Sequence, residues 1–324
     1  MHFPKRDVWI LLKIRPFKKE SDEEAFVSIF NACFGDYDDI RSISLKELRR
    51  WEEAPSFSFD GMFVAEWNGE IAGMVNAFVD RLREEKKGFV QWLAVLPKFR
   101  RKGIAKKLVE KALENLKQRG MIMAETWAQS DRKACVHLFE SFGFKQLRAT
   151  NLMGTSLKHI PADVGENLEV AIREADLKNN DDIALVNCLE NEAFMEHFNY
   201  RPKPIEETKY VLTELPWFQK QAVFFALAND KAVGYVETGI DEGLNSEKNL
   251  KYGWILDIGI LKPYRQKGIG KRLMLQGMQR LKTQGMTEAL LYVDEMNPTR
   301  ATRLYEALGF KTQRRNIVYQ LILV

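Results

Sequence analysis

The segment Pro263–Met274 reads PYRQKGIGKRLM and follows a run of strand-forming residues, WILDIGIL, at 254–261. A similar segment, KFRRKGIAKKLV, occupies Lys98–Val109. At an offset of 165 positions the two segments share six of their twelve residues: Arg, Lys, Gly, Ile, Lys and Leu. Separated stretches this similar indicate an internal duplication. The sequence therefore predicts two copies of one structural unit.

The similarity continues along the chain in the same order. Each half is predicted to contain a strand, a helix, a hairpin, a strand, the glycine-basic loop with a long helix, a strand, a helix and a strand. The hairpin turns are expected at Asn68-Gly69 and Asn229-Asp230, which are turn formers between apolar runs. We expect an α/β (α+β) protein of two lobes, each with a mixed, mostly antiparallel sheet flanked by helices. The predicted boundaries are an N-terminal lobe at 1–157, a linker at 158–167 and a C-terminal lobe at 168–324.

The composition narrows the class of protein. A length of 324 residues allows two domains of ordinary size, and 45% hydrophobic with 29% charged residues is typical of a globular protein. A net charge of +4 does not require a nucleic-acid partner, and the basic helical faces lack interleaved aromatic residues. The three cysteines have no paired spacing for a metal or a disulfide framework, and no apolar run is long enough to span a membrane. We expect a cytoplasmic protein without metal, nucleic acid or membrane as a partner.

The repeated loop has the features of an anion site. A strand that enters a helix through Arg-x-x-Gly-x-Gly leaves backbone N–H groups exposed at the helix start, where the helix dipole is positive. Arg265 and Arg272 stand where a P-loop needs Gly and Ser or Thr, and Leu273 stands where a dinucleotide fingerprint needs its third Gly. The loop is therefore predicted to bind a pyrophosphate. The alternative is a glycine-containing turn beside a solvated basic helix.

Two motifs carry a resemblance to a known family. Arg265–Gly270 and Arg100–Ala105 match Arg/Gln-x-x-Gly-x-Gly/Ala, and Asn297–Phe310 matches Asn-x-x-x-Ala-x-x-Leu-Tyr-x-x-x-Gly-Phe. With these motifs the chain resembles the GCN5-related N-acetyltransferase (GNAT) superfamily, in the tandem layout also known in mycothiol synthase. The resemblance implies that acetyl-CoA binds and that an acceptor amine attacks it directly. It implies cofactor contacts by Ile258, Ile260, Arg265, Gln266, Lys267, Gly268, Ile269, Gly270 and Asn297, and in the first half by Val95, Arg100, Arg101, Lys102, Gly103, Ile104 and Ala105.

The resemblance also favours the C-terminal lobe as the catalytic one. In this family a tyrosine on the later helix commonly protonates the departing thiolate, and Tyr305 takes its place, whereas the first half has Phe139. Asp257, in an otherwise apolar strand, is the candidate base, and the first half has Trp92 there. Such a carboxylate needs a hydrogen-bond partner and is expected to have a raised pKa. The alternatives are that Tyr305 only packs and that Asp257 only anchors a neighbouring loop.

Three further expectations concern the surroundings of these residues. The glutamate that histone-type members and mycothiol synthase carry fourteen residues before the first motif glycine is replaced by Trp254, and by Phe89 in the first half. Gly259 is predicted to mark a β-bulge that frees main-chain N–H groups for the acetyl carbonyl. Asn297 and Pro298 are predicted to begin the second helix of the motif.

The segment 191–218 is expected to form the acceptor side of the C-terminal cleft. Phe194, His197 and Glu237 are the candidate substrate contacts; the alternative is that the aromatic residues only pack and the charges are solvated. We expect transfer to the amine of a small molecule, by a monomer with an internal pseudo-dimer. A protein N-terminus or lysine as the acceptor, and an acyl-CoA sensor without catalysis, are the alternatives.

Overall fold

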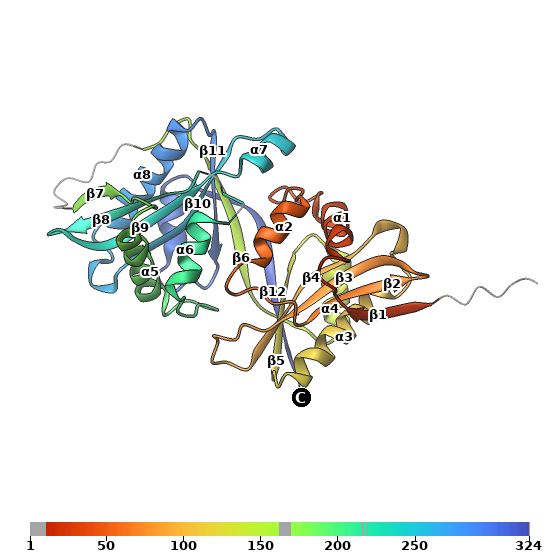
Figure 1. The fold of residues 1–324 in the computed structure, drawn as a ribbon. Coiled ribbons are helices and arrows are strands. Elements are labelled where there is room, and N and C mark those ends of the chain that lie inside the picture. The colour runs from red at the N-terminus through yellow and green to blue at the C-terminus, as the bar shows by residue number, and fades with distance from the viewer. Residues whose placement is uncertain (1–10, 162–169, 216, 219, 324) are drawn as a thin grey trace, which may run out of the picture.

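A computed structural model of the chain describes residues 11–161, 170–215, 217–218 and 220–323. The described residues form two lobes, one built mainly from the first half of the chain and one mainly from the second (Figure 1). Most of the predicted linker at 158–167 lies outside the described residues. None of the helices in the described part has the length and apolar character needed to cross a bilayer.

The first half has the predicted succession of elements, with one additional helix before the hairpin. Its elements are β1 (Leu12–Pro16), α1 (Glu23–Phe34), α2 (Leu45–Glu52), β2 (Met62–Trp67), β3 (Glu70–Phe78), β4 (Lys87–Val95), α3 (Ile104–Gln118), β5 (Met123–Gln129), α4 (Lys133–Ser141) and β6 (Lys145–Ser156). The additional helix α2 begins with a capping box, in which Ser44 and Glu47 satisfy each other's backbone N–H groups.

The second half repeats this succession and adds a short helix after its hairpin. Its elements are β7 (Val170–Glu174), α5 (Asn180–Phe194), α6 (Ile205–Thr213), β8 (Ala222–Ala228), β9 (Lys231–Gly239), α7 (Glu242–Lys248), β10 (Tyr252–Ile260), α8 (Ile269–Thr283), β11 (Glu288–Asp294), α9 (Ala301–Ala307) and β12 (Lys311–Ile322).

The predicted start of the last helix is wrong. Helix α9 begins at Ala301, not at Asn297 and Pro298. The side chain of Asn297 instead accepts a hydrogen bond from the N–H of Thr299 at 2.8 Å, which closes a turn before the helix. Arg300 has a φ of +55°, a left-handed conformation that the interior of an α-helix does not contain, so the helix starts after it.

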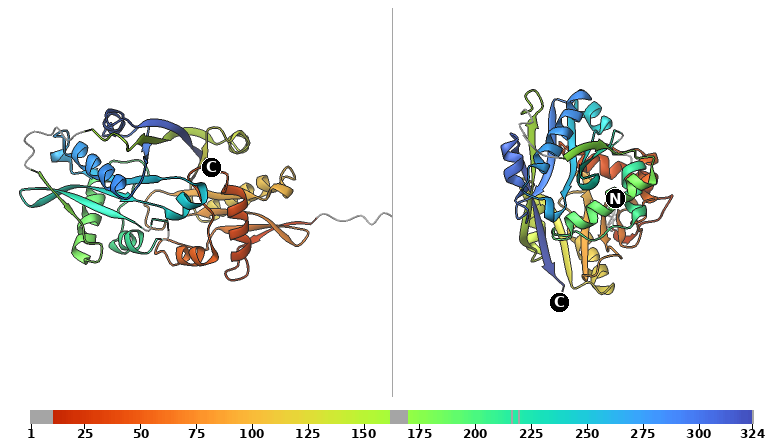
Figure 2. Two further views of the ribbon diagram at one scale, coloured as in Figure 1. Left: turned by 90° about the horizontal axis from the view of Figure 1, so that it is seen from above. Right: turned by 90° about the vertical axis from the view of Figure 1, so that its left-hand side faces the viewer.

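All twelve strands of the described residues form one sheet, in the order β1-β2-β3-β4-β5-β12-β6-β11-β10-β9-β8-β7. Only the pairs β4–β5 and β10–β11 are parallel, which confirms the predicted mixed, mostly antiparallel fold. The two halves exchange their last strands, which was not predicted: β6 lies between β12 and β11, and β12 lies next to β5. Figures 1 and 2 show these two long strands side by side between the lobes.

The same contacts recur in the two halves at a spacing of 160 residues. The side chain of Asn31 accepts a hydrogen bond from Ile43 N–H (2.8 Å) and donates one to Ile43 O (3.0 Å). Asn191 makes the same two bonds with Lys203, also at 2.8 and 3.0 Å. This equivalence fixes the alignment of the loop after α1 with the loop after α5.

Two equivalent ion pairs also cross the interface between the lobes. Arg41 of the first half pairs with Asp241 of the second at 2.9 Å, and Arg201 of the second pairs with Asp80 of the first at 2.7 Å. Each arginine also pairs with a glutamate of the helix that follows it. The lobes are therefore related by a pseudo-two-fold arrangement, in which each lends an acid to the other.

Candidate active site

The C-terminal lobe has a cleft where its two parallel strands separate. Strands β10 and β11 pair only over Tyr252–Trp254 and Glu288–Leu290, and beyond these residues a cleft of about 820 Å³ opens. Its lining includes most residues predicted for this lobe: Phe194, His197, Asp257, Ile258, Ile260, Arg265, Gln266, Gly268, Gly270, Asn297 and Tyr305. The predicted residues Glu237, Lys267 and Ile269 are not among the described residues that line it.

The glycine-basic loop forms one end of this cleft. Gln266 and Gly268 have φ values of +60° and +82°, so the chain turns twice through the left-handed region before α8 begins. The first turn of α8 leaves its N–H groups without intrahelical acceptors, at the positive end of the helix dipole. Arg265 has a structural part: its Nε donates to Ile260 O and its Nη2 to Ala193 O, both at 2.9 Å. The donor set of main-chain amides fits the anionic phosphates of a nucleotide carrier.

The loop of the first half has the same backbone. Arg101 and Gly103 have φ values of +62° and +78°, and Arg100 Nε donates to Val95 O at 3.0 Å. A Cβ added at Gly103 would meet no atom within 4 Å. The ammonium of Lys102 lies 4.9 Å from the centre of the Trp67 ring. The two loops therefore have the same backbone conformation. Contacts of a cofactor with Ile104, Ala105 and their neighbours remain a prediction.

Asp257 presents a carboxylate at the wall of the cleft. It accepts hydrogen bonds from the hydroxyl of Tyr235 (2.6 Å) and from Ile258 N–H (3.0 Å). Burial, followed by the negative charge of Glu190, raises the pKa of Asp257 to about 7. A carboxyl group with this pKa can take up a proton at neutral pH, which is the property required of a general base.

The strand is irregular next to this carboxylate, but not where it was predicted. The pairing of β10 with β9 shifts by one residue between Ile255 and Asp257, which makes Leu256 the bulged residue. The predicted bulge at Gly259 is wrong, because Gly259 pairs regularly with Tyr235. A Cβ at Gly259 would lie 2.7 Å from the Tyr235 ring, so the glycine is explained by the close approach of this side chain.

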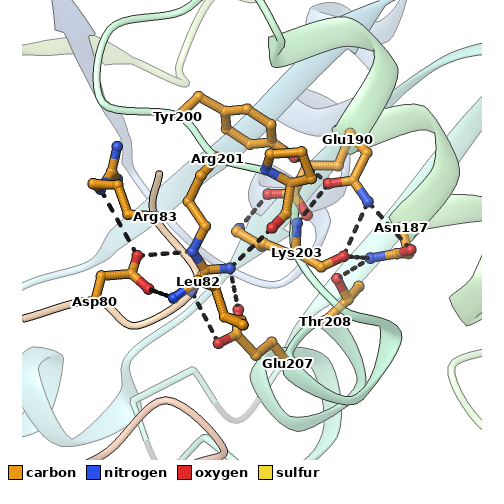
Figure 3. A network of polar contacts seen from close by, with 12 residues as sticks. Asp80, Leu82, Arg83, Asn187, Glu190, Tyr200, Arg201, Lys203, Glu207 and Thr208 are labelled. Carbon is orange, nitrogen blue, oxygen red and sulfur yellow. Dashed lines mark hydrogen bonds and ion pairs between the residues drawn. The ribbon is translucent and has the colours of Figure 1, made fainter. Parts of the chain in front are cut away.

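Two charged residues that interact with Asp257, Glu190 and Lys203, were not predicted from the sequence. Lys203, in the loop between α5 and α6, donates a hydrogen bond from Nζ to Oε1 of Glu190 on α5 (Figure 3). Glu237 lies opposite Asp257 in the strand pair, and burial followed by the charge of Asp257 raises its pKa to about 8. Its Oε1 accepts a hydrogen bond from Gln221 at 3.0 Å. Asp257, Glu190, Glu237 and Lys203 therefore form a cluster of three carboxyl groups and one ammonium, of which Asp257 lines the cleft.

The first half has other residues at the positions of this cluster. The equivalent residues are Phe30 for Glu190, Ile43 for Lys203, Met74 for Tyr235, Asn76 for Glu237, Trp92 for Asp257 and Phe139 for Tyr305. Most of them pack in apolar clusters, and Trp92 and Phe139 line a separate cavity of about 420 Å³. Comparison of the halves at the spacing of 160 is the signal in the sequence that could have revealed Glu190 and Lys203.

Tyr305 lies across the cleft on α9. It is 6% exposed, and burial together with the charge of Asp257 raises its pKa, so the phenol holds its proton at neutral pH. Phe194 and His197 also line the cleft, and the centres of their rings are 4.5 Å apart. Burial lowers the pKa of His197. No group of three or more His, Cys, Asp or Glu side chains in the described residues is arranged to hold a metal ion.

Comparison with known proteins gives matches for both halves. The sequence profile of the family described as "Acetyltransferase (GNAT) family" matches residues 24–144 and 190–310. Mycothiol acetyltransferase of Thermobispora bispora is 29% identical over 232 residues, which cover 70% of this chain and 74% of that protein. The protein of the same name from Actinosynnema mirum is 26% identical over 269 residues, or 82% of this chain and 86% of that one.

Solved structures share the fold. A GCN5-related N-acetyltransferase from Sphaerobacter thermophilus has a TM-score of 0.69 and 19% identity, and the match covers 96% of each chain. A tandem GNAT protein from the clavulanic acid biosynthesis pathway has a TM-score of 0.74 and 14% identity, over 97% of this chain and 99% of that one.

Proposed function

The chain belongs to the acetyltransferase (GNAT) family, and we propose that its C-terminal lobe transfers an acetyl group from acetyl-CoA to the amine of a small molecule. The observation that carries this proposal is that Asp257, Tyr305 and the loop at Gly268 line one cleft. The first half keeps the loop but has Trp92 and Phe139 in place of the two titratable groups, which supports the assignment of the chemistry to the C-terminal lobe.

Each residue has a part in the transfer. Amides of the loop around Gly268 hold the diphosphate of the donor. The main-chain N–H groups of Ile258 and Ile260 bind the acetyl carbonyl, where negative charge develops, and for this the Ile258 N–H gives up its hydrogen bond to Asp257. Asp257 takes a proton from the acceptor ammonium, directly or through a water molecule, so that the neutral amine attacks the carbonyl carbon. As the carbon–sulfur bond breaks, Tyr305 gives its proton to the sulfur.

The acceptor is proposed to be a small molecule that lies against Phe194 and His197. Relatives named mycothiol acetyltransferase support an acceptor of this class, as does the position of these two side chains beside Asp257 in the cleft. Glu237, which does not reach the cleft, acts behind Asp257 and not as a direct contact. We further propose that the protein works as a monomer, because its two lobes already form an internal pseudo-dimer. We also propose that it acts in the cytoplasm, where free cysteines such as Cys33, Cys135 and Cys188 stay reduced.

Acetyl transfer measured with a panel of small amines and with peptides tests the proposal. We expect turnover of small amines, with kcat/KM falling as the pH drops below about 7, where Asp257 becomes protonated. Asp257→Asn should lower kcat/KM at least about a hundredfold across the pH range. Acetylation of peptides alone would replace the small-molecule acceptor by a protein. Tight CoA binding without turnover of any amine would make the chain a sensor.

A further inference from the structure

The ion pair between Glu190 and Lys203 belongs to the C-terminal lobe alone. The side chain of Glu190 is 9% exposed and that of Lys203 is 35% exposed. A largely buried ion pair costs desolvation energy that its attraction does not always return. The first half forms the same fold with Phe30 and Ile43 at these positions, so the fold itself does not require the two charges. This contrast points to a role in the chemistry.

Hydrogen bonds and ion pairs from several elements hold the loop that carries Lys203 in place (Figure 3). Asn191 binds both backbone groups of Lys203, and the hydroxyl of Tyr200 donates to Asn191 Oδ1 at 2.5 Å. Between them, Arg201 binds Glu207 of α6 at 2.6 Å and Asp80 of the other lobe at 2.7 Å. The position of the ammonium is therefore set by contacts from both lobes.

Helix α5, which carries Glu190, packs against β9 and β10, and a Cβ added at Gly259 of β10 would lie 3.0 Å from Ala193 of α5. Asp257 interacts with charged and titratable groups of β9, α5, the loop after α5 and α9. These are Tyr235 and Glu237 from β9, Glu190 from α5, Tyr200 and Lys203 from the loop after α5, and Tyr305 from α9. Lys203 is the cation of this group, and it faces two acids besides its partner Glu190.

We propose that Glu190 and Lys203 are positioning residues that act on the base through their opposite charges, Lys203 favouring the ionised form of Asp257 and Glu190 favouring the protonated form. The inference rests on the proposed function of Asp257. In agreement with it, Glu190 raises and Lys203 lowers the pKa of Asp257. Without Lys203 the base would stay protonated at neutral pH, and without Glu190 its carboxylate would be a weaker proton acceptor.

Two single substitutions test this with opposite expected signs. In Lys203→Met the acidic limb of kcat/KM against pH should move up by about one pH unit, so that at pH 6 kcat/KM is about a hundredfold below its plateau value, compared with about tenfold in the wild type. In Glu190→Gln the limb should move down by about one unit. The double variant should return it close to the wild-type position, and Lys203→Arg should keep it there.

A matched control lies on the same helix. Asp182→Asn breaks the ion pair of Asp182 with Arg173 (2.8 Å) at the start of α5, far along the helix from Glu190. It should lower thermal stability without moving the pH limb. Limbs that move in the same direction in Lys203→Met and Glu190→Gln would overturn the inference and leave a purely structural role for the pair.

The protonation of Asp257 is also measurable without turnover. Infrared titration follows the band of the protonated carboxyl group, which is assigned by its loss in Asp257→Asn. Opposite shifts of this titration in Lys203→Met and Glu190→Gln support the inference. If these shifts occur while the pH dependence of kcat/KM stays fixed, the ion pair controls Asp257 but Asp257 is not the base, and the proposed function fails in its place. An unshifted band overturns the inference.

Discussion

Replacement of Gly268 by Ala, with Gly103→Ala as the control, compares the two loops under the same backbone strain. Gly268 and Gly103 have φ values of +82° and +78°. An L-residue in this left-handed region costs about 1 to 2 kcal/mol. Both variants should therefore lose a similar free energy of unfolding, on the order of 1 kcal/mol, which corresponds to a fall in Tm of about 2 °C for a chain of this size.

The effect on donor binding should differ between the two variants. The new methyl group at residue 268 would lie in the lining of the cleft, and relief of the strain would turn the neighbouring N–H groups away from the phosphates. Loss of one hydrogen bond to a charged group is worth about 1.5 to 3 kcal/mol, which is roughly ten- to a hundredfold in affinity. Gly103→Ala should leave the KM for acetyl-CoA unchanged, because the first half has Trp92 and Phe139 in place of the proposed base and acid.

The assay is steady-state acetyl transfer at varied acetyl-CoA concentration, together with thermal unfolding of both variants. The expected result is a KM for acetyl-CoA raised about tenfold or more in Gly268→Ala alone, at equal losses of Tm. An equal rise in KM for Gly103→Ala would show that the first loop serves the reaction. An unchanged KM in Gly268→Ala, at the expected loss of stability, would remove the loop from donor binding.

Three further outcomes are expected. Tyr305→Phe should lower kcat about a hundredfold with an unchanged KM for acetyl-CoA, whereas Tyr319→Phe, on β12 in the core of the N-terminal lobe, should not change kcat. Glu237 has a folded-state pKa of about 8, above its ordinary value of 4.5, so the wild type loses stability as the pH rises between these values. The Tm of Glu237→Gln should therefore equal that of the wild type at pH 4 and exceed it at pH 9. The fragment 1–157 should not fold alone, because β6 loses both of its neighbours, and co-expression with 158–324 should restore a folded species by circular dichroism.

The sequence predicts well those features that depend on residue types close together in the chain. The two loops need glycine at a left-handed position and basic residues at a helix start, and both requirements lie within six residues of each other. The repeat then orders the strands and helices. Asp257 stands out as a carboxylate in an otherwise apolar strand, Tyr305 is indicated by its match to the family motif, and the structure brings both to the cleft.

The features that were missed depend on contacts between distant parts of the chain. Strands β6 and β12 each carry apolar residues that must be buried, but this does not indicate with which half each strand pairs. A glycine within a strand predicts a bulge at Gly259, whereas the actual cause of this glycine is the close approach of Tyr235, a contact between strands that the sequence does not show. Glu190 and Lys203 look like solvated charges in sequence, and only the equivalent Phe30 and Ile43 reveal that their positions are buried.

Because the two halves exchange strands, the first half supports the cleft of the C-terminal lobe, although it contributes neither Asp257 nor Tyr305. Strand β11 forms one wall of the cleft, and it is held along Glu288–Asp294 by β6 of the first half. Arg148 of β6 pairs with Asp294 at the end of that wall, and Asp80 of the first half anchors Arg201 next to Lys203. The first half, which has Trp92 and Phe139 in place of Asp257 and Tyr305, therefore still holds one wall of the cleft in position. Substitutions that loosen the lobe interface should for this reason act on kcat as well as on stability, because they move a wall of the cleft.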